Sequence, residues 1–215
     1  MTEDATTTTA GTTIGGYLEV LASDSPTPGG GAVAGVVAAT AGALVAMVGR
    51  LTAGKEEFSG VAERMEVLIA KGDAARHAFL ELADRDAHAF DGVMAAFKMP
   101  KATDEDKRVR SAAIQAGYLD AAGVPMEIAR TAVELMEFAL EATATGNPAA
   151  ASDGWSGLAC AYAAVMCAIA NVEINAASIK DVAAKASLAE EVTAVRGRAE
   201  QLLGQGQAAF LLRIS

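Results

Sequence analysis

Two stretches of the chain are apolar on nearly every side of a helix, namely residues 32–48 and residues 155–170. The first contains no charged residue and is rich in Ala, Gly and Val. A helix that is apolar all round lies either in a protein core or in a membrane. Because Ala and Gly favour membrane insertion less than Leu or Phe and suit close helix–helix contact, we expect two central helices of a bundle and no membrane span.

A third packing surface is predicted on one side of a long helix between residues 56 and 99. Apolar positions recur there every three or four residues, which is the spacing of one helical face. A bend is expected near Gly72, and Pro100 ends the pattern. The inward stripe consists of Phe79, Leu82, Asp86, Ala89, Phe90, Val93 and Phe97, so one carboxylate is expected to point into the bundle.

The remaining breaks divide the rest of the chain into shorter helices. Pro125 is expected to separate two of them, since proline lacks the backbone N–H that a helix interior needs. Residues 1–13 are expected to form a flexible tail, and residues 14–215 a single domain. The predicted fold is an all-α, antiparallel helical bundle around two central apolar helices, the second of which is expected to run over residues 152–179. Further helices are expected at residues 17–22, 104–122, 125–145 and 188–212.

Composition and charge narrow the fold class and the possible partners. The chain is 52% hydrophobic, largely through Ala, and only 5% aromatic, which favours close-packed helices over sheets. A formal net charge of −10 argues against a nucleic-acid partner, because phosphate binding needs a positive surface. Cys160 and Cys167 would lie about 10 Å apart along one helix, too far for a disulfide. We therefore expect reduced thiols and, with no signal-peptide pattern at the N-terminus, a cytoplasmic protein.

Asp86 is the first candidate for chemistry. It lies between Leu82 and Phe90 in the inward stripe, and a buried carboxylate is costly unless it is paired. Burial displaces the pKa of such a group upward, toward the range in which a general acid or base works. The alternative is a structural acid at the edge of the bundle, paired with Arg85 or with a neighbouring helix.

A proline and three glycines open the first apolar helix: Pro28, Gly29, Gly30 and Gly31. Consecutive glycines at a helix N-terminus leave backbone N–H groups accessible, and the positive end of the helix suits a carboxylate or a phosphate. The alternative is a tight turn with unusual backbone angles. The turn lacks the Lys-Ser/Thr ending of a P-loop and follows no predicted strand, so we exclude nucleotide binding.

Two amides stand four residues apart on one face of the second apolar helix, Asn171 and Asn175. Buried amides must be hydrogen-bonded, either to each other and nearby backbone or to the polar edge of a ligand. Both a polar clamp between helices and a binding role therefore remain open.

Other polar residues have simpler explanations beside a functional one. Ser152 and Asp153 are placed to cap a helix, with a role in the site as the second possibility. Lys55 supplies positive charge at the end of the first apolar helix, which either compensates the helix dipole or attracts an anionic ligand. His77 and His88 lie on one charged helix face, and two histidines without clustered cysteines do not predict a metal site.

Several ordered blocks together resemble the cyclodeaminase family, which comprises the C-terminal domain of formiminotransferase-cyclodeaminase and free-standing methenyltetrahydrofolate cyclohydrolases. The resemblance runs from about residue 18 to residue 181. The blocks are SPTPGGGAVAG (25–35), AMVGRLTAGK (46–55), DAHAFDGVMAAFKMPKAT (86–103), Arg110, Val124-Pro125, GNPAAASD (146–153), NVEIN (171–175) and Asp181. One departure is Trp155 after Asp153-Gly154, where relatives often carry smaller residues.

The resemblance implies an all-helical and typically homodimeric enzyme that acts on a tetrahydrofolate derivative, with no permanently bound cofactor. It implies that Asp86 is the proton donor or acceptor, and that Gly29–Gly31 and the 171–175 helix line the folate pocket. Lys55 and the glycine amides would then hold the carboxylates of the glutamate tail, and Asn171 and Asn175 would bond the pterin or orient Asp86.

Three functions follow in order of preference. The first is hydrolysis of 5,10-methenyltetrahydrofolate to 10-formyltetrahydrofolate. The second is cyclisation of formimidoyltetrahydrofolate with release of ammonia, which gives the methenyl compound. The third, from a different class, is a helical interaction protein that keeps the fold without the chemistry.

Overall fold

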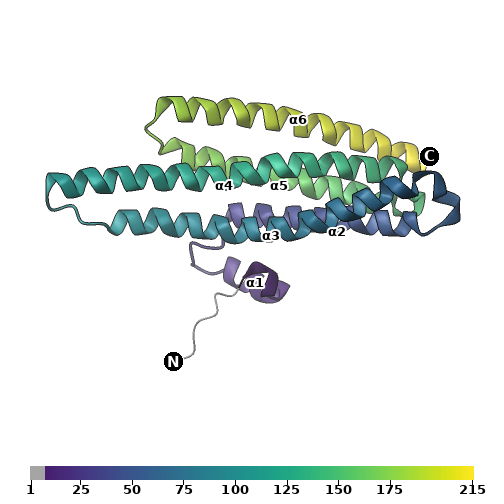
Figure 1. The fold of residues 1–215 in the computed structure, drawn as a ribbon, viewed down its shortest axis with the longest axis horizontal. Helices are drawn as coiled ribbons and strands as arrows, with labels where there is room; N and C mark the ends of the chain where they lie inside the picture. The colour runs from purple at the N-terminus through teal and green to yellow at the C-terminus, as the bar shows by residue number, and fades with distance from the viewer. Residues whose placement is uncertain (1–7) are drawn as a thin grey trace.

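Long helices lie side by side along the longest axis of the molecule (Figure 1). The computed structural model describes residues 8–215, and within that range no strand occurs. The prediction of an all-α bundle is confirmed. The helices are α1 (Ile14–Leu21), α2 (Gly30–Ala53), α3 (Ala62–Lys98), α4 (Asp104–Thr145), α5 (Ala151–Ala177) and α6 (Val182–Ile214), and 3-10 turns occur at Thr9–Gly11, Glu56–Val61 and Pro148–Ala150.

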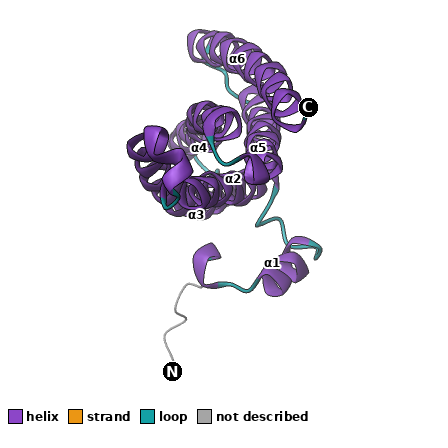
Figure 2. Ribbon diagram, turned by 90° about the vertical axis from the view of Figure 1, so that its right-hand side faces the viewer, coloured by secondary structure: helices purple, strands orange, loops and turns teal. Residues whose placement is uncertain are grey.

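The two apolar helices α2 and α5 form the middle of the bundle. They pack against each other, with α3 covering α2 and with α4 and α6 covering α5. Figure 2 shows α1 set apart from this bundle. By length and composition alone α2 and α5 could each cross a membrane, but here much of their surface is buried in the protein core.

Glycines at seven-residue intervals let α2 approach α3 very closely. A Cβ added at Gly42 would lie 2.9 Å from the Gly72 carbonyl oxygen, and one added at Gly72 would lie 2.5 Å from the Gly42 carbonyl oxygen. Gly35 and Gly49 meet α3 in the same way, at 2.7 Å from the nearest atom. The helix α3 runs through Gly72 without a break, so this glycine serves close packing.

Pro125 does not divide a helix, contrary to the prediction, and α4 runs unbroken through it. Because proline has no N–H, the Ala121 carbonyl one turn earlier lacks its usual helical donor. The side chain of Asn175 on α5 supplies that donor, with 2.8 Å between Nδ2 and the carbonyl oxygen. A neighbouring helix thus satisfies the group that would otherwise end α4.

Two helix boundaries also differ from the predictions. Before α1, within the segment expected to be a flexible tail, Thr9 is hydrogen-bonded to Asp84; residues 1–7 lie outside the described part. The long helix α3 begins only after the Glu56–Val61 turn. Helix α6 begins earlier than expected, because the Asp181 side chain accepts two backbone N–H bonds at its start.

Candidate active site

The Asp86 side chain reaches from α3 to the first turn of α2. Gly29, the N-cap of α2, has no side chain to satisfy the exposed N–H groups there, and the Asp86 carboxyl group lies close enough to the Ala32 amide for that amide to lower its pKa. A Cβ added at Gly31 would lie 2.2 to 2.4 Å from the three atoms of the carboxyl group. Gly31 is therefore required by the close approach of Asp86.

The electrostatics of Asp86 suit proton transfer near neutral pH. Burial raises the pKa of its carboxyl group to about 6, against the opposing effect of the Ala32 amide. Among residues 8–215 no Lys or Arg forms an ion pair with it, and Arg85 pairs instead with Glu127 at 2.9 Å. The alternative of a carboxylate paired with Arg85 is thus wrong. With a pKa in this range, Asp86 can both accept and donate a proton.

Beside Asp86 lies a cavity of about 300 Å³ in which both predicted amides meet it. The Asn171 amide group donates to the Cys167 carbonyl at 2.8 Å, and that of Asn175 donates to the Ala121 and Asn171 carbonyls. These bonds use the amide nitrogens and leave both side-chain oxygens available as acceptors. The cavity is lined by Pro26, Thr27, Gly29, Gly30, Asp86, Phe90, Ala121, Asn171, Ile174 and Asn175.

Gly30 is required by close approach as well. A Cβ added there would lie 2.8 Å from Nδ2 of Asn171. Pro28 does not line this cavity but the wall of an adjoining one. The Asp86 carboxyl group already lies at this end of α2, beside Gly31 and the Ala32 amide, which leaves less of the helix end for a second anion.

The structure does not bring the remaining candidates to Asp86 within one chain. Lys55 follows the far end of α2, about 36 Å from the start of that helix at 1.5 Å per residue. It is exposed and lies 4.0 Å from Glu57. Ser152 and Asp153 are in the first turn of α5, at the same far end, where Asn147 bonds the backbone of Leu51. Their assignment to the Asp86 pocket rests on the resemblance alone.

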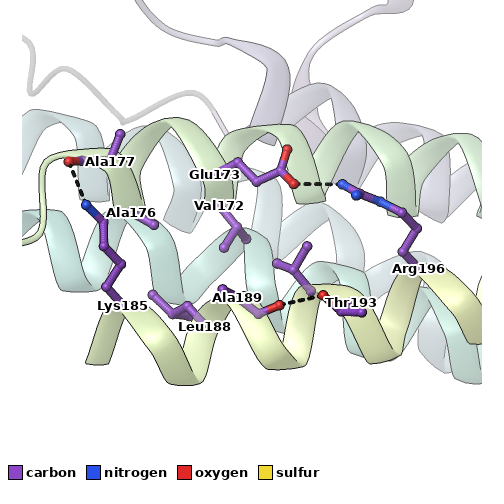
Figure 3. Close-up of a pocket in the computed structure, with 10 residues that line it drawn as sticks. Val172, Glu173, Ala176, Ala177, Lys185, Leu188, Ala189, Thr193 and Arg196 are labelled. Atoms are coloured by element: carbon purple, nitrogen blue, oxygen red, sulfur yellow. Dashed lines mark hydrogen bonds and ion pairs between the residues drawn. The ribbon is translucent and has the colours of Figure 1, made fainter. Parts of the chain in front are cut away.

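A second cavity, of about 320 Å³, separates α5 from α6 (Figure 3). Its charged groups are already engaged: Arg196 pairs with Glu173 at 2.7 Å, and Lys185 donates to the Ala177 carbonyl at 3.1 Å. Its other lining residues include the aliphatic side chains Val172, Leu188 and Val192. The Asp86 cavity is the better candidate because it combines an unpaired carboxylate with free amide oxygens.

Sequence reasoning missed Tyr17. Its hydroxyl is buried and has no hydrogen-bond partner among residues 8–215. Burial raises the pKa of the phenol, and the carboxylates of Asp86 and Asp84 raise it further. A tyrosine in a short amphipathic helix gives no periodic signal, and only the fold places it beside these acids.

Comparisons with known proteins identify the family of the chain. A family model described as formiminotransferase-cyclodeaminase matches residues 13–194. A methenyltetrahydrofolate cyclohydrolase of Methylorubrum extorquens is 37% identical over 79% of this chain and 81% of its own length. The formimidoyltransferase-cyclodeaminase of Sus scrofa is 35% identical over 83% of this chain, which spans only 33% of the pig protein.

A solved structure carries the same fold. The formiminotetrahydrofolate cyclodeaminase of Thermotoga maritima superposes with a TM-score of 0.85 at 27% identity, covering 95% of this chain and 98% of that one. The family model matches well over half of the chain, and the fold agrees over nearly all of it. The chain therefore belongs to the formiminotransferase-cyclodeaminase family.

Proposed function

We propose that the protein is an enzyme that hydrolyses 5,10-methenyltetrahydrofolate to 10-formyltetrahydrofolate, with Asp86 as its acid–base residue. The observation that carries the proposal is an unpaired, half-buried carboxyl group with a pKa of about 6 beside a cavity of about 300 Å³. The Methylorubrum cyclohydrolase supports the choice of reaction, because this chain covers most of that protein but only a third of the pig one.

The bridge carbon of the substrate is electrophilic because it carries the positive charge of a cyclic amidinium. Ionised Asp86 attracts this cation and removes a proton from the attacking water, so that a C–O bond forms at the bridge carbon. Asp86 then returns the proton to the ring nitrogen N5 as the bond between N5 and the bridge carbon breaks. The hydroxyl proton of the adduct leaves to Asp86 and then to solvent as the C=O bond forms, so one proton is released overall. The formyl group stays on N10, and the step uses only water and protein groups.

The amides of Asn171 and Asn175 have a role that follows from their hydrogen bonds. Their nitrogens are held by backbone carbonyls, so their oxygens face a ligand as acceptors. The pterin ring carries N–H donors on its edge and suits such acceptors. We assign these two residues to substrate binding. We assign no permanently bound cofactor to the site.

The second candidate is formimidoyltetrahydrofolate cyclodeaminase. The names of the pig relative and of the Thermotoga structure favour it. In that reaction N10 attacks the formimidoyl carbon, and the same acid protonates the departing amine to release ammonia. The methenyl compound is the substrate of the first reaction and the product of the second, so a site that binds it suits either reaction.

One assay separates the candidates, namely the near-ultraviolet absorbance of the methenyl compound. Loss of absorbance faster than in buffer supports the hydrolase, whereas its appearance from formimidoyltetrahydrofolate with ammonia release supports the cyclodeaminase. Asp86→Asn should lower turnover by a factor of roughly 100 to 10,000. Asp91→Asn, an exposed carboxylate on the same helix, is the control. Substantial turnover in Asp86→Asn would remove Asp86 from the mechanism.

We also propose that the protein acts as a cytoplasmic homodimer. Both cysteines are free thiols, which suits a reducing compartment. Apolar side chains such as Ile14 and Leu212 are about four-fifths exposed and are available for a second copy. Light scattering on the purified protein tests the dimer, with a monomeric mass at micromolar concentration as the contrary result.

A further inference from the structure

The segment before the glycine turn is held against α3 beside Asp86. The backbone N–H and the hydroxyl of Thr9 both bind the Asp84 carboxylate, at 2.9 and 2.5 Å. Helix α1, which follows, lies off the bundle (Figure 2), and none of its residues is fully buried by the described part of the chain. The segment therefore covers one face of α3 without joining the hydrophobic core.

Between this segment and α3 lies a cavity of about 380 Å³. It adjoins the Asp86 cavity, because Thr27 lines both. Its walls are mostly apolar groups and hydroxyls rather than charges. They are formed by Thr9, Thr12, Tyr17, Val20, Thr27, Pro28, Ala83, Asp84 and Ala87.

The Tyr17 side chain lines this cavity, and its hydroxyl is an unused hydrogen-bond donor beneath the wall. It is fully buried without a partner in residues 8–215, a situation that is rare in folded proteins and calls for a ligand or a water. Burial, and to a smaller extent the negative charges of Asp86 and Asp84, raise the pKa of the phenol, so it stays protonated. A protonated phenol offers a donor to a polar atom held next to Asp86.

The shape of the substrate matches two adjoining cavities. In methenyltetrahydrofolate the reactive carbon lies between a pterin and a p-aminobenzoyl ring. Each cavity is at the small end of the range of about 300–1,000 Å³ for ligand pockets, so a molecule of this length needs both. The free oxygens of Asn171 and Asn175 suit the pterin, which leaves the apolar cavity for the benzoyl ring.

We propose that the cavity between the 8–28 segment and α3 is the p-aminobenzoyl subsite, and that Tyr17 donates a hydrogen bond to the substrate beside Asp86. The inference rests on the proposed function and deepens it. It makes Tyr17 a catalytic residue and Ala87 a determinant of substrate binding. It also explains why the 8–28 segment, whose helix α1 has no fully buried residue, is hydrogen-bonded to α3 next to Asp86.

Two pairs of variants test the subsite. Tyr17→Phe keeps the ring that packs against α3 and removes only the donor, and Tyr162→Phe on α5 is its control. Ala87→Leu fills the cavity, and Ala78→Leu at an exposed position of the same helix is its control. We expect Tyr17→Phe to lower kcat roughly 10- to 100-fold with KM changed less, and Ala87→Leu to raise KM at least tenfold.

Binding of p-aminobenzoyl-L-glutamate, followed by ligand-observed NMR, gives a readout that needs no turnover. Wild type and Ala78→Leu should bind it, and Ala87→Leu should not. If wild type binds this probe but turns over no folate, the proposed function fails and the subsite stands. If wild type does not bind it, or if Ala87→Leu binds it equally well, the subsite is refuted. Unchanged kcat in Tyr17→Phe, with wild type active, refutes the role of Tyr17.

Discussion

The Asp86 carboxyl group weakens the fold at neutral pH. Burial raises its pKa in the folded protein from 3.8 to about 6, so between these values the folded state binds more protons than the unfolded state. Stability therefore falls as pH rises through this window, and above it the ionised group costs up to about 3 kcal/mol. Natural selection tolerates such a cost where the group has a function.

Asp86→Asn should accordingly stabilise the protein above pH 7. The amide keeps the shape of the side chain but carries no charge. We expect a higher midpoint of thermal unfolding at pH 7.5, with the difference vanishing near pH 4. Circular dichroism at both pH values measures it. A destabilised variant at pH 7.5 would show that the charged form is favoured by the fold.

Catalytic activity should also depend on the ionisation of Asp86, but it should rise with pH where stability falls. The hydrolytic step needs ionised Asp86 as the base, so kcat/KM should fall as pH drops below about 6. Measured from pH 4.5 to 8, the acidic limb should have a midpoint near 6. A midpoint near 4 would indicate an ordinary, solvated carboxylate and would contradict the burial seen here.

At the scale of elements, the start of α2 is shaped around the site. Gly31→Ala would place a Cβ 2.2 Å from Oδ1 of Asp86, so the carboxylate must move. We expect kcat/KM to fall roughly 100-fold, as displacements of about 1 Å do at other active sites, with helical content unchanged. In Gly204→Ala, at an exposed position of α6, the new Cβ meets nothing within 4 Å, and activity should remain. Equal losses in both variants would point to helix propensity instead.

Helices α4 and α5 are joined by one hydrogen bond that Pro125 makes necessary. Asn175→Ala leaves the buried Ala121 carbonyl without a donor and should cost about 1–3 kcal/mol of unfolding free energy. In a Pro125→Ala background residue 125 supplies an N–H, so the same substitution should cost clearly less. Urea unfolding of the four proteins in this double-mutant cycle gives the coupling. A cost that is equal in both backgrounds would contradict the account.

The elements differ in how far the sequence could define them. The core faces of α2 and α5 follow directly from their apolar patterns, and Asp86 follows from the three-and-four spacing of α3. The unbroken course of α4 does not follow, because the donor for Ala121 comes from a residue 54 positions away. Phe97 belongs to the predicted inward stripe yet is 41% exposed, with its ring against Tyr118 and Arg110 of α4.

At the scale of the whole molecule, the site residues predicted from the sequence lie at two opposite ends of the bundle. Asp86, Gly30 and Asn171 meet because antiparallel helices juxtapose the start of α2 with the end of α5. The same topology carries Lys55 and Ser152 to the opposite end. Pattern analysis along the chain gives no such distances, and Tyr17 illustrates the converse case of a residue found only through the fold.

The net charge of the molecule sets a last expectation. The protein carries −10, and none of the described residues that line the Asp86 cavity is Lys or Arg. Methenyltetrahydrofolate has one positive charge and two carboxylates, so at low salt the long-range field repels it. Raising the ionic strength from about 10 to 100 mM shortens the Debye length from roughly 30 to 10 Å and screens this field. We therefore expect kcat/KM to rise a few-fold with salt.

Substrates of different charge separate this field effect from a general effect of salt on the enzyme. Each added glutamate makes the substrate more negative, so polyglutamated substrate should show a steeper rise, and a methenyl-tetrahydropteroate without glutamate a flat response. Initial rates at substrate concentrations well below KM measure it. A kcat/KM that falls with salt would mean that attraction dominates. The cations responsible would then have to come from outside the cavity lining, and Lys55 of a second copy would become the first to substitute.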